Sequence, residues 1–281
     1  MPELPEVETV RRGLERWCLN TKIVGTQTLH PRSTSDRSIA PLDALLGSSI
    51  TKISRRGKFL WFELDRPFAL VAHLGMSGQF RVQPVDLPDE RHLRARLTLK
   101  KLGSLKGITE LRFVDQRTFG WLAISQYQGD APTLVAHISY DIFDPLFDRD
   151  SVISIFRSKK IAIKKVLLDQ SVMSGVGNIY ADESLWRAKI HPLTNPDSLS
   201  VRKIAVLLKS VESVMSQALR EGGTSFDSLY TNVNGESGYF ANSLNAYGRT
   251  DQPCTRCGNP ISRIIVGGRS SHFCSRCQVL T

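Results

Sequence analysis

Apolar residues near the start of the chain recur at helical spacing. These positions are Val7, Val10, Leu14 and Trp17. Side chains three or four residues apart share one face of a helix, so the spacing predicts a helix that begins at about Pro5. Proline suits a first helical turn, and the acids Glu3, Glu6 and Glu8 suit the positive end of the helix dipole.

From about residue 23 to residue 128 the apolar period changes from helical spacing to alternation. Six segments alternate in this way: Lys58–Leu64, Phe68–His73, Gln79–Gln83, Leu93–Leu99, Glu110–Val114 and Gly120–Ile124. Turn residues separate them at short intervals. Short strands spaced like this predict an antiparallel sandwich or barrel.

Beyond a segment rich in proline and aspartate, residues 131–150, the pattern becomes helical again. We expect helices over Ser151–Arg157, Ile163–Leu168 and about Leu199–Leu219. Between them, Gly175-Val-Gly-Asn178 predicts a tight turn with Asn178 capping a further helix, and a helix N-terminus of this kind binds phosphate well. It is not a dinucleotide fingerprint, because no strand precedes it and the third glycine is missing.

Two Cys-x-x-Cys pairs near the end, Cys254/Cys257 and Cys274/Cys277, predict a metal site. Sixteen residues separate the pairs, which is room for a hairpin that brings four sulfurs to one Zn²⁺. The turn falls at Gly267-Gly268, with Arg269 at its tip. Disulfides are the less favoured alternative, because no export signal precedes them and a chain of this length does not need such staples. Four thiolates leave no open position for water, so the zinc is expected to be structural.

Charge and composition change the picture in one respect. The 281 residues include 37 Lys+Arg against 27 Asp+Glu, a formal net charge of +10. That surplus favours a polyanionic partner, nucleic acid ahead of a membrane surface. Absence of a long apolar run or an export signal favours a reducing cytoplasm, in which Cys18 is a buried thiol.

Pro2 has a chemical potential that its place before a helix does not explain. Removal of Met1 would leave a secondary amine with a reference pKa near ~8, which is far more nucleophilic at neutral pH than a lysine. Such an amine attacks an electrophilic carbon and forms an iminium, and Glu3 beside it could serve as general acid or base. Taken alone, however, a proline at this place is more often merely structural.

Three motifs in order resemble the bacterial formamidopyrimidine-DNA glycosylases, which belong to the helix–two-turn–helix group of base-excision repair enzymes. They are Pro2-Glu-Leu-Pro-Glu6, Gly175-Val-Gly-Asn-Ile-Tyr-Ala181, and Cys254–Cys277 with Arg269 before the second pair. The resemblance implies an α+β protein. An N-terminal helix and antiparallel β-sandwich would span residues 1–130, a linker 131–150, a helical helix–two-turn–helix domain 151–246 and a β-hairpin zinc finger 247–281.

The resemblance also implies a bifunctional enzyme, a glycosylase and apurinic/apyrimidinic lyase. It would excise 8-oxoguanine and formamidopyrimidines from duplex DNA and cleave the strand by β,δ-elimination. Pro2 would be the nucleophile at C1′, Glu3 the carboxylate that protonates the sugar oxygen, and Glu6 a supporting acid. Lys58 and Arg269 would contact phosphate and assist elimination.

Further DNA contacts are carried over residue by residue. They are His73, His92, Arg117, Lys160 and Asn178. A base inside a duplex must be flipped out before it can be attacked, and the gap must be filled; Met76, Arg117 and Phe119 match the family's wedge. Residues 232–238, in a loop rich in glycine and serine, match the segment that closes over the everted base.

The expected partner is damaged double-stranded DNA, bound by a monomer in the bacterial cytoplasm in association with the nucleoid, with one structural Zn²⁺ and no organic cofactor. Two alternatives stay open: a non-enzymatic zinc protein that binds DNA, and the same chemistry on oxidised pyrimidines. The leucine in Pro2-Glu-Leu-Pro favours the purine-directed branch, and the intact cysteine set argues against the zincless members.

Overall fold

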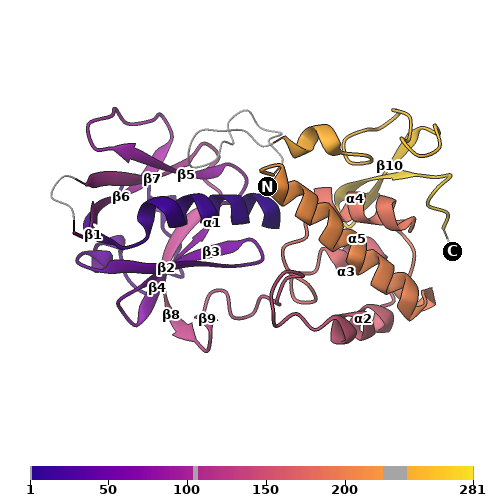
Figure 1. The fold of residues 1–281 in the computed structure, drawn as a ribbon, viewed down its shortest axis with the longest axis horizontal. Coiled ribbons are helices and arrows are strands. Elements are labelled where there is room, and N and C mark those ends of the chain that lie inside the picture. The colour runs from indigo at the N-terminus through magenta and orange to yellow at the C-terminus, as the bar shows by residue number, and fades with distance from the viewer. Residues whose placement is uncertain (1, 104–106, 224–238, 281) are drawn as a thin grey trace. The chain divides into compact units, whose positions relative to one another are not determined.

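The computed structural model describes residues 2–103, 107–223 and 239–280. It divides into two compact units (Figure 1). We call Met1–His137 with Gly222–Tyr239 the β unit, and Ile138–Glu221 with Phe240–Thr281 the helical unit. The six predicted strands and the predicted helices are all present.

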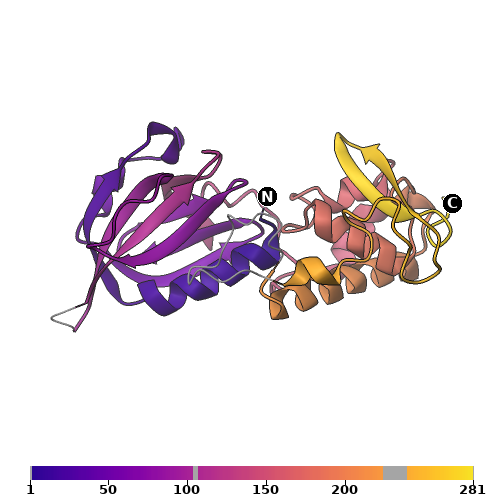
Figure 2. The ribbon, with the colours of Figure 1, turned by 90° about the horizontal axis from the view of Figure 1, so that it is seen from above.

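The β unit opens with helix α1, Leu4–Cys18, which begins one residue earlier than predicted. Its buried face includes Val7, Val10 and Leu14, as the spacing indicated. The prediction was wrong for Trp17, which is 52% exposed, because the fully buried Cys18 ends the apolar face instead. Figure 2 shows α1 in indigo along the strands of this unit.

One antiparallel sheet makes up most of the other described residues of the β unit. Its strands are β1 (Thr21–Thr28), β2 (Ser49–Arg56), β3 (Phe59–Leu64), β4 (Phe68–His73), β5 (Gly78–Pro84), β6 (Leu93–Lys101), β7 (Ile108–Asp115), β8 (Trp121–Gln128) and β9 (Ala131–Pro132). They lie in the order β5-β7-β6-β1-β2-β3-β4-β8-β9. The sequence pattern had not separated β1 and β2.

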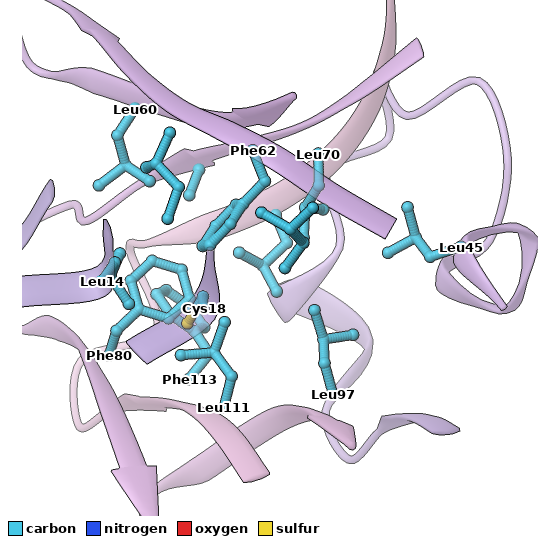
Figure 3. Packing of buried hydrophobic residues seen from close by; sticks show 14 of the residues in the cluster. Leu14, Cys18, Leu45, Leu60, Phe62, Leu70, Phe80, Leu97, Leu111 and Phe113 are labelled. Atoms are coloured by element: carbon cyan, nitrogen blue, oxygen red, sulfur yellow. The ribbon is translucent and has the colours of Figure 1, made fainter. Parts of the chain in front are cut away.

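The sheet folds over on itself at the β1–β2 junction. β1 pairs with β2 through only two residue pairs, and its register against β6 shifts between Ile23 and Gly25. Such a bulge bends a strand. The two halves therefore face each other: Phe62 of β3 meets Phe80 of β5 at a ring distance of 5.7 Å, and Phe80 lies 5.2 Å from Phe113 (Figure 3). This core confirms the expected sandwich.

Over its described residues, the helical unit contains four α-helices and one hairpin. The helices are α2 (Arg149–Ser158), α3 (Ile163–Leu167), α4 (Asn178–Ala188) and α5 (Val201–Arg220), and the hairpin strands are β10 (Ile261–Val266) and β11 (Arg269–Cys274). Short 3-10 turns occur in the β unit at Pro31–Ser33 and Leu42–Leu45, and in the helical unit at Pro196–Ser198 and Phe240–Ser243. No helix among the described residues has the length and apolarity needed to cross a bilayer.

Helix α4 corrects one expectation. Asn178 is the first helical residue and makes no side-chain cap, while Gly177 occupies the capping position. The prediction that Asn178 caps the helix was therefore wrong by one residue. Its side chain instead reaches the zinc hairpin, as described below.

Candidate active site and metal centre

The first turn of α1 holds two buried carboxylates beside Pro2. Glu3 occupies the capping position and Glu6 lies three residues later, forming a reciprocal capping box. The Glu3 backbone N–H donates to Glu6 Oε2 at 2.9 Å. Both side chains are only 3% exposed, and Pro2 is buried with them. The arrangement fixes the backbone at the start of the helix.

Gly223 lies against the Glu6 side chain. A Cβ at this position would lie 3.1 Å from Glu6 Cγ and Oε1, and its φ of +85° favours glycine. The segment after α5 therefore approaches the capping box as closely as a residue without a side chain allows. The predicted closing segment 232–238 lies outside the described residues.

Lys58 lies in a two-residue turn between β2 and β3. Gly57 precedes it with φ +57°, the positive value that the first residue of a type II′ hairpin turn requires. Lys58 is 7% exposed. Its two basic neighbours are held by acids: Arg55 Nε donates to Glu8 at 3.1 Å, and Arg56 donates to Asp130 at 2.5 Å.

His73, at the end of β4, lies between two aromatic rings. Its ring centroid is 4.9 Å from that of Phe59 and 5.8 Å from that of Trp121. Burial, followed by the nearby Lys58 cation, lowers the pKa of His73 to about 4. The Gly75 N–H donates to its Nδ1 at 3.2 Å, so the neutral ring carries its proton on Nε2.

Three large side chains expected to touch DNA are exposed on two neighbouring loops. Met76, in the β4–β5 loop, is 40% exposed, and Phe119, in the β7–β8 loop, is 56% exposed. The guanidinium of the exposed Arg117 lies 5.4 Å above the Phe119 ring. His92 is half-buried in the turn before β6, where its carbonyl accepts the Asp115 N–H at 2.9 Å.

In the helical unit, Asn178 and Arg269 are brought close through a shared neighbour. Asn178 Nδ2 donates to the carbonyl of Ser270 at 2.9 Å, and Arg269 is the residue before it. The hairpin turn at Gly267-Gly268 has φ of +58° and +75°, as a two-residue type I′ turn requires. Arg269 is exposed as the first residue of β11.

Sequence reasoning missed the buried cluster behind this contact. Lys164 is fully buried, and its Nζ donates to Asp182 at 2.6 Å and to the same Ser270 carbonyl at 2.7 Å. Asp182 also accepts from Ser271 Oγ at 3.1 Å, and from the His272 N–H at 2.8 Å. The cluster joins α3, α4 and β11. By contrast, Lys160 is exposed in the segment between α2 and α3.

The four cysteines of the two Cys-x-x-Cys pairs converge. All four Sγ atoms lie within 4.8 Å of one another, and none forms a disulfide. Zn–S bonds of about 2.3 Å in a tetrahedron place sulfurs about 3.8 Å apart, so the donor set fits Zn²⁺. The Trp186 indole N–H donates to Cys254 Sγ at 3.4 Å, which supports the thiolate. These observations agree with the expected structural zinc.

Side chains outside the cysteine set fasten the zinc hairpin to the helices. Gln278 Oε1 accepts the Cys274 N–H at 2.9 Å, while its Nε2 donates to the Ile190 carbonyl at 2.8 Å. Phe273 packs edge-on against His191 at 4.5 Å. The guanidinium of Arg256 lies 4.0 Å over the Trp186 ring. Figure 2 shows the hairpin in yellow beside the helices of this unit.

A sandwich whose first helix begins at buried carboxylates, together with a helical unit that carries a four-cysteine hairpin, defines the zinc-finger helix–two-turn–helix class of proteins. Family models match three successive segments. Residues 1–122 match the formamidopyrimidine-DNA glycosylase N-terminal domain, 138–229 its H2TH domain, and 251–279 a zinc finger found in FPG and IleRS. The chain therefore belongs to the formamidopyrimidine-DNA glycosylase family.

Relatives and solved structures agree over nearly the whole length. The formamidopyrimidine-DNA glycosylase of Thermobifida fusca (strain YX) is 51% identical, covering 99% of this chain and 97% of the relative. The formamidopyrimidine-DNA glycosylase of Nocardioides sp. (strain ATCC BAA-499 / JS614) is 53% identical, covering 99% of this chain and 94% of the relative. A crystal structure of a Lactococcus lactis FPG mutant with Fapy-dG containing DNA gives a TM-score of 0.86 at 34% identity, covering 99% of this chain and 100% of that chain. The Lactococcus lactis Fpg complex with abasic-site DNA gives a TM-score of 0.84 at 34% identity, covering 98% of this chain and 99% of that chain.

Proposed function

We propose that this protein excises oxidised purines, namely 8-oxoguanine and formamidopyrimidines, from duplex DNA and then cleaves the strand at the abasic site. Relatives that share half of its residues carry the glycosylase name, and its structural neighbours were solved with Fapy-dG and abasic-site DNA. The observation that carries the proposal is the buried pair Glu3 and Glu6 at the helix start beside Pro2. A net charge of +10 supports a DNA partner.

Pro2 is the nucleophile in this proposal. Once Met1 is removed, its secondary amine attacks C1′ of the damaged nucleotide, and the bond from C1′ to the base breaks with its electron pair leaving on the base. Glu3 protonates the sugar ring oxygen, the ring opens and the C1′–N bond becomes an iminium. Glu6 supports this step indirectly, because its carboxylate holds the Glu3 N–H and so fixes the first turn.

The iminium acidifies the hydrogen on C2′. Loss of that proton expels the 3′ phosphate in β-elimination. A second proton loss expels the 5′ phosphate in δ-elimination. Each expelled phosphate leaves with the electron pair of its C–O bond, so nearby cations assist both departures. We assign this assistance to Lys58 in the β unit and Arg269 in the helical unit, with Asn178 as a neutral phosphate donor.

The remaining contacts serve binding and base eversion. His73, His92 and Lys160 contact the backbone, which gives affinity without sequence preference and strong salt dependence. Met76, Arg117 and Phe119 fill the gap that the everted nucleotide leaves. Apolar side chains compensate for unstacking in this way, and unstacking costs a few kcal/mol.

Zinc, when bound by the four cysteines, supplies a fold-stabilising link and no open coordination position. The hairpin it closes carries Arg269. We further propose that the protein acts as a monomer in the bacterial cytoplasm and associates with the nucleoid, since its relatives are bacterial enzymes and its partner is DNA.

Borohydride trapping tests the central step. Reduction of the iminium on 8-oxoguanine duplex should join protein and DNA covalently, and peptide mass spectrometry should find the adduct on Pro2. Glu3→Gln should lose excision while circular dichroism shows a folded protein. Glu15→Gln is the matched control on the same helix, because Glu15 is 43% exposed and paired with Arg11.

Absence of an adduct, with Met1 verified to be removed, would overturn the proposal. Unchanged excision by Glu3→Gln would overturn the role of that carboxylate. Excision rates on thymine glycol set against 8-oxoguanine separate purine-directed from pyrimidine-directed activity. Salt-sensitive binding without strand scission would mark a non-enzymatic DNA-binding protein instead.

A further inference from the structure

A buried carboxylate joins the two loops that carry Met76, Arg117 and Phe119. Asp115, the last residue of β7, is 0% exposed. Its Oδ1 accepts the Ser77 hydroxyl at 2.5 Å and the Arg117 N–H at 3.1 Å, and its Oδ2 accepts the Gly120 N–H at 2.7 Å. Ser77 Oγ also accepts the Arg117 N–H at 3.0 Å. Both loops therefore depend on one side chain.

Close backbone contact leaves these loops little room to move separately. A Cβ on Gly75 would lie 2.4 Å from the Phe119 carbonyl carbon and 2.5 Å from the Gly120 nitrogen. Gly75 also has a φ of +60°. The β4–β5 loop is thus pressed directly against the β7–β8 loop, and a shift in one requires a shift in the other.

Thr118 shows that the β7–β8 loop is held in a conformation it would not adopt freely. Its φ is +55°, in the left-handed region that a β-branched residue rarely occupies. Such a conformation persists only where surrounding bonds fix it. The Asp115 bonds to Arg117 and Gly120 lie on either side of Thr118, so they supply that restraint.

All of these bonds lie on the buried side of the loops, while the large side chains stand on the exposed side. We propose that Asp115 is a positioning residue that fixes Met76, Arg117 and Phe119 as one rigid wedge. The inference rests on the proposed function, which assigns these side chains to the gap left by an everted nucleotide. A wedge ordered before binding loses little conformational entropy when it enters the base stack.

The carboxylate is suited to this role in a way that an amide is not. Its two oxygens accept all three donors at once, and bonds to an ionised acceptor are stronger than neutral ones. Asp115→Asn replaces one oxygen with a donor group, so at least one of the two loops loses its restraint. The substitution preserves the size of the side chain and does not change the identity of Met76, Arg117 or Phe119.

The test compares two substrates for one enzyme. Excision of 8-oxoguanine from a paired duplex requires a stacked base to be everted, whereas cleavage at a preformed abasic site does not. In single-turnover assays, Asp115→Asn should slow 8-oxoguanine excision by about 10- to 100-fold. Cleavage of the abasic substrate should change by less than about threefold on the same scale.

Fluorescence reports the wedge step directly. A 2-aminopurine beside the lesion brightens as it unstacks, and this signal should slow with Asp115→Asn in parallel with excision. Ser77→Ala removes the two bonds of the Ser77 hydroxyl but keeps the carboxylate with its bonds to Arg117 and Gly120, so it should give a smaller loss of the same kind. Gln116→Ala is the matched control, because Gln116 is exposed between the bonded residues and none of the loop-joining bonds involves its side chain.

Equal slowing of both substrates by Asp115→Asn and by Ser77→Ala would overturn the positioning role, since general damage to the site would explain it. Unchanged excision would overturn it as well. Failure of the wild-type protein to excise 8-oxoguanine while it still cleaves abasic DNA would instead overturn the proposed substrate, and with it the need for a wedge. The two failures are thus distinct.

Discussion

Asp182→Asn should destabilise the helical unit far more than removal of an exposed ion pair of the same length. Lys164 Nζ and Asp182 Oδ1 are 2.6 Å apart with side chains 0% exposed, and Arg149 and Glu212 are also 2.6 Å apart but 41% and 43% exposed. Breaking a buried pair leaves an uncompensated charge and costs about 3–5 kcal/mol. Glu212→Gln should cost about 1 kcal/mol or less.

The cost of about 3–5 kcal/mol for Asp182→Asn follows from the positive charge that stays on the buried Lys164. Without the Asp182 charge, the buried Lys164 ammonium loses the ion pair with Asp182, while the neutral Ser270 carbonyl still accepts its N–H. Asp182 also holds Ser271 and His272 of β11, so the zinc hairpin loses anchoring bonds at the same time. Lys164→Met combined with Asp182→Leu removes both charges, and should be less destabilising than Asp182→Asn alone.

Urea unfolding of the zinc-loaded protein, followed by circular dichroism, gives the free energies. Zinc release to a chromogenic chelator reports on the hairpin separately, and should be faster in Asp182→Asn than in Glu212→Gln. Equal costs for the two single substitutions would refute the reasoning, because burial would then make no difference between pairs of equal length. A double variant less stable than Asp182→Asn would contradict the charge argument as well.

Three further predictions concern stability and metal. His73→Gln should flatten the decline in stability between about pH 6.5 and 4. Burial and a neighbouring lysine cation lower the pKa of folded His73 to about 4, so the unfolded state takes up the proton first as pH falls. The wild type therefore loses up to about 3 kcal/mol of unfolding free energy over this range. The wild-type minus variant difference in unfolding free energy measures it, and a flat difference contradicts it. Cys274→Ser should lose zinc, measured by metal analysis, while Cys18→Ala keeps it; a zinc-bound serine variant would disprove the four-cysteine site. Gly75→Ala should lower the unfolding free energy by more than about 1–2 kcal/mol, because the new Cβ would lie 2.4 Å from a backbone atom. Gly47→Ala is the control, because Gly47 also has a positive φ but open space around it, and it should cost less. Equal losses would show that the close backbone contact of Gly75 does not matter.

Periodicity was sufficient for the helices and for most strands, because one face of each element is buried and the apolar spacing records that face. It failed at the corner of the sheet. The register of β1 shifts between Ile23 and Gly25, that of β2 shifts between Ile50 and Lys52, and only two residue pairs join the two strands. A strand that changes layers does not keep one buried face, so alternation is weak there.

The candidate site divides along similar lines. Cysteine spacing predicted the metal centre directly, because two ligands per tight turn are encoded locally. The roles of Pro2 and Glu3 came from resemblance, since a proline before a helix has an ordinary explanation. Asp115 and Asp182 were missed because each has a partner far away in sequence: Ser77 is 38 positions from Asp115, and Ser271 is 89 positions from Asp182. No local pattern marks such a residue.

The same limit applies to charge. Residues 159–165 contain four lysines, of which Lys160 was carried over from the family as a DNA contact. Lys164 is fully buried against Asp182, while Lys160 and Lys165 are exposed. Adjacent lysines on a short helix point in different directions, and only packing decides which of them faces solvent. A count of basic residues therefore overstates the surface available to phosphate in this segment.

Acidic residues in this basic protein organise its interior and its cationic side chains. Asp115 restrains the loops that carry Arg117, and Asp182 holds the strand that begins at Arg269. Glu183 is buried and accepts backbone N–H groups of residues 245–247. Glu8, partly buried yet bonded by three arginines, has its pKa lowered to about 2. Neutralising one of these acids should weaken DNA binding, because the cationic side chains that it holds are misplaced. The loss should occur even though the substitution raises the net positive charge.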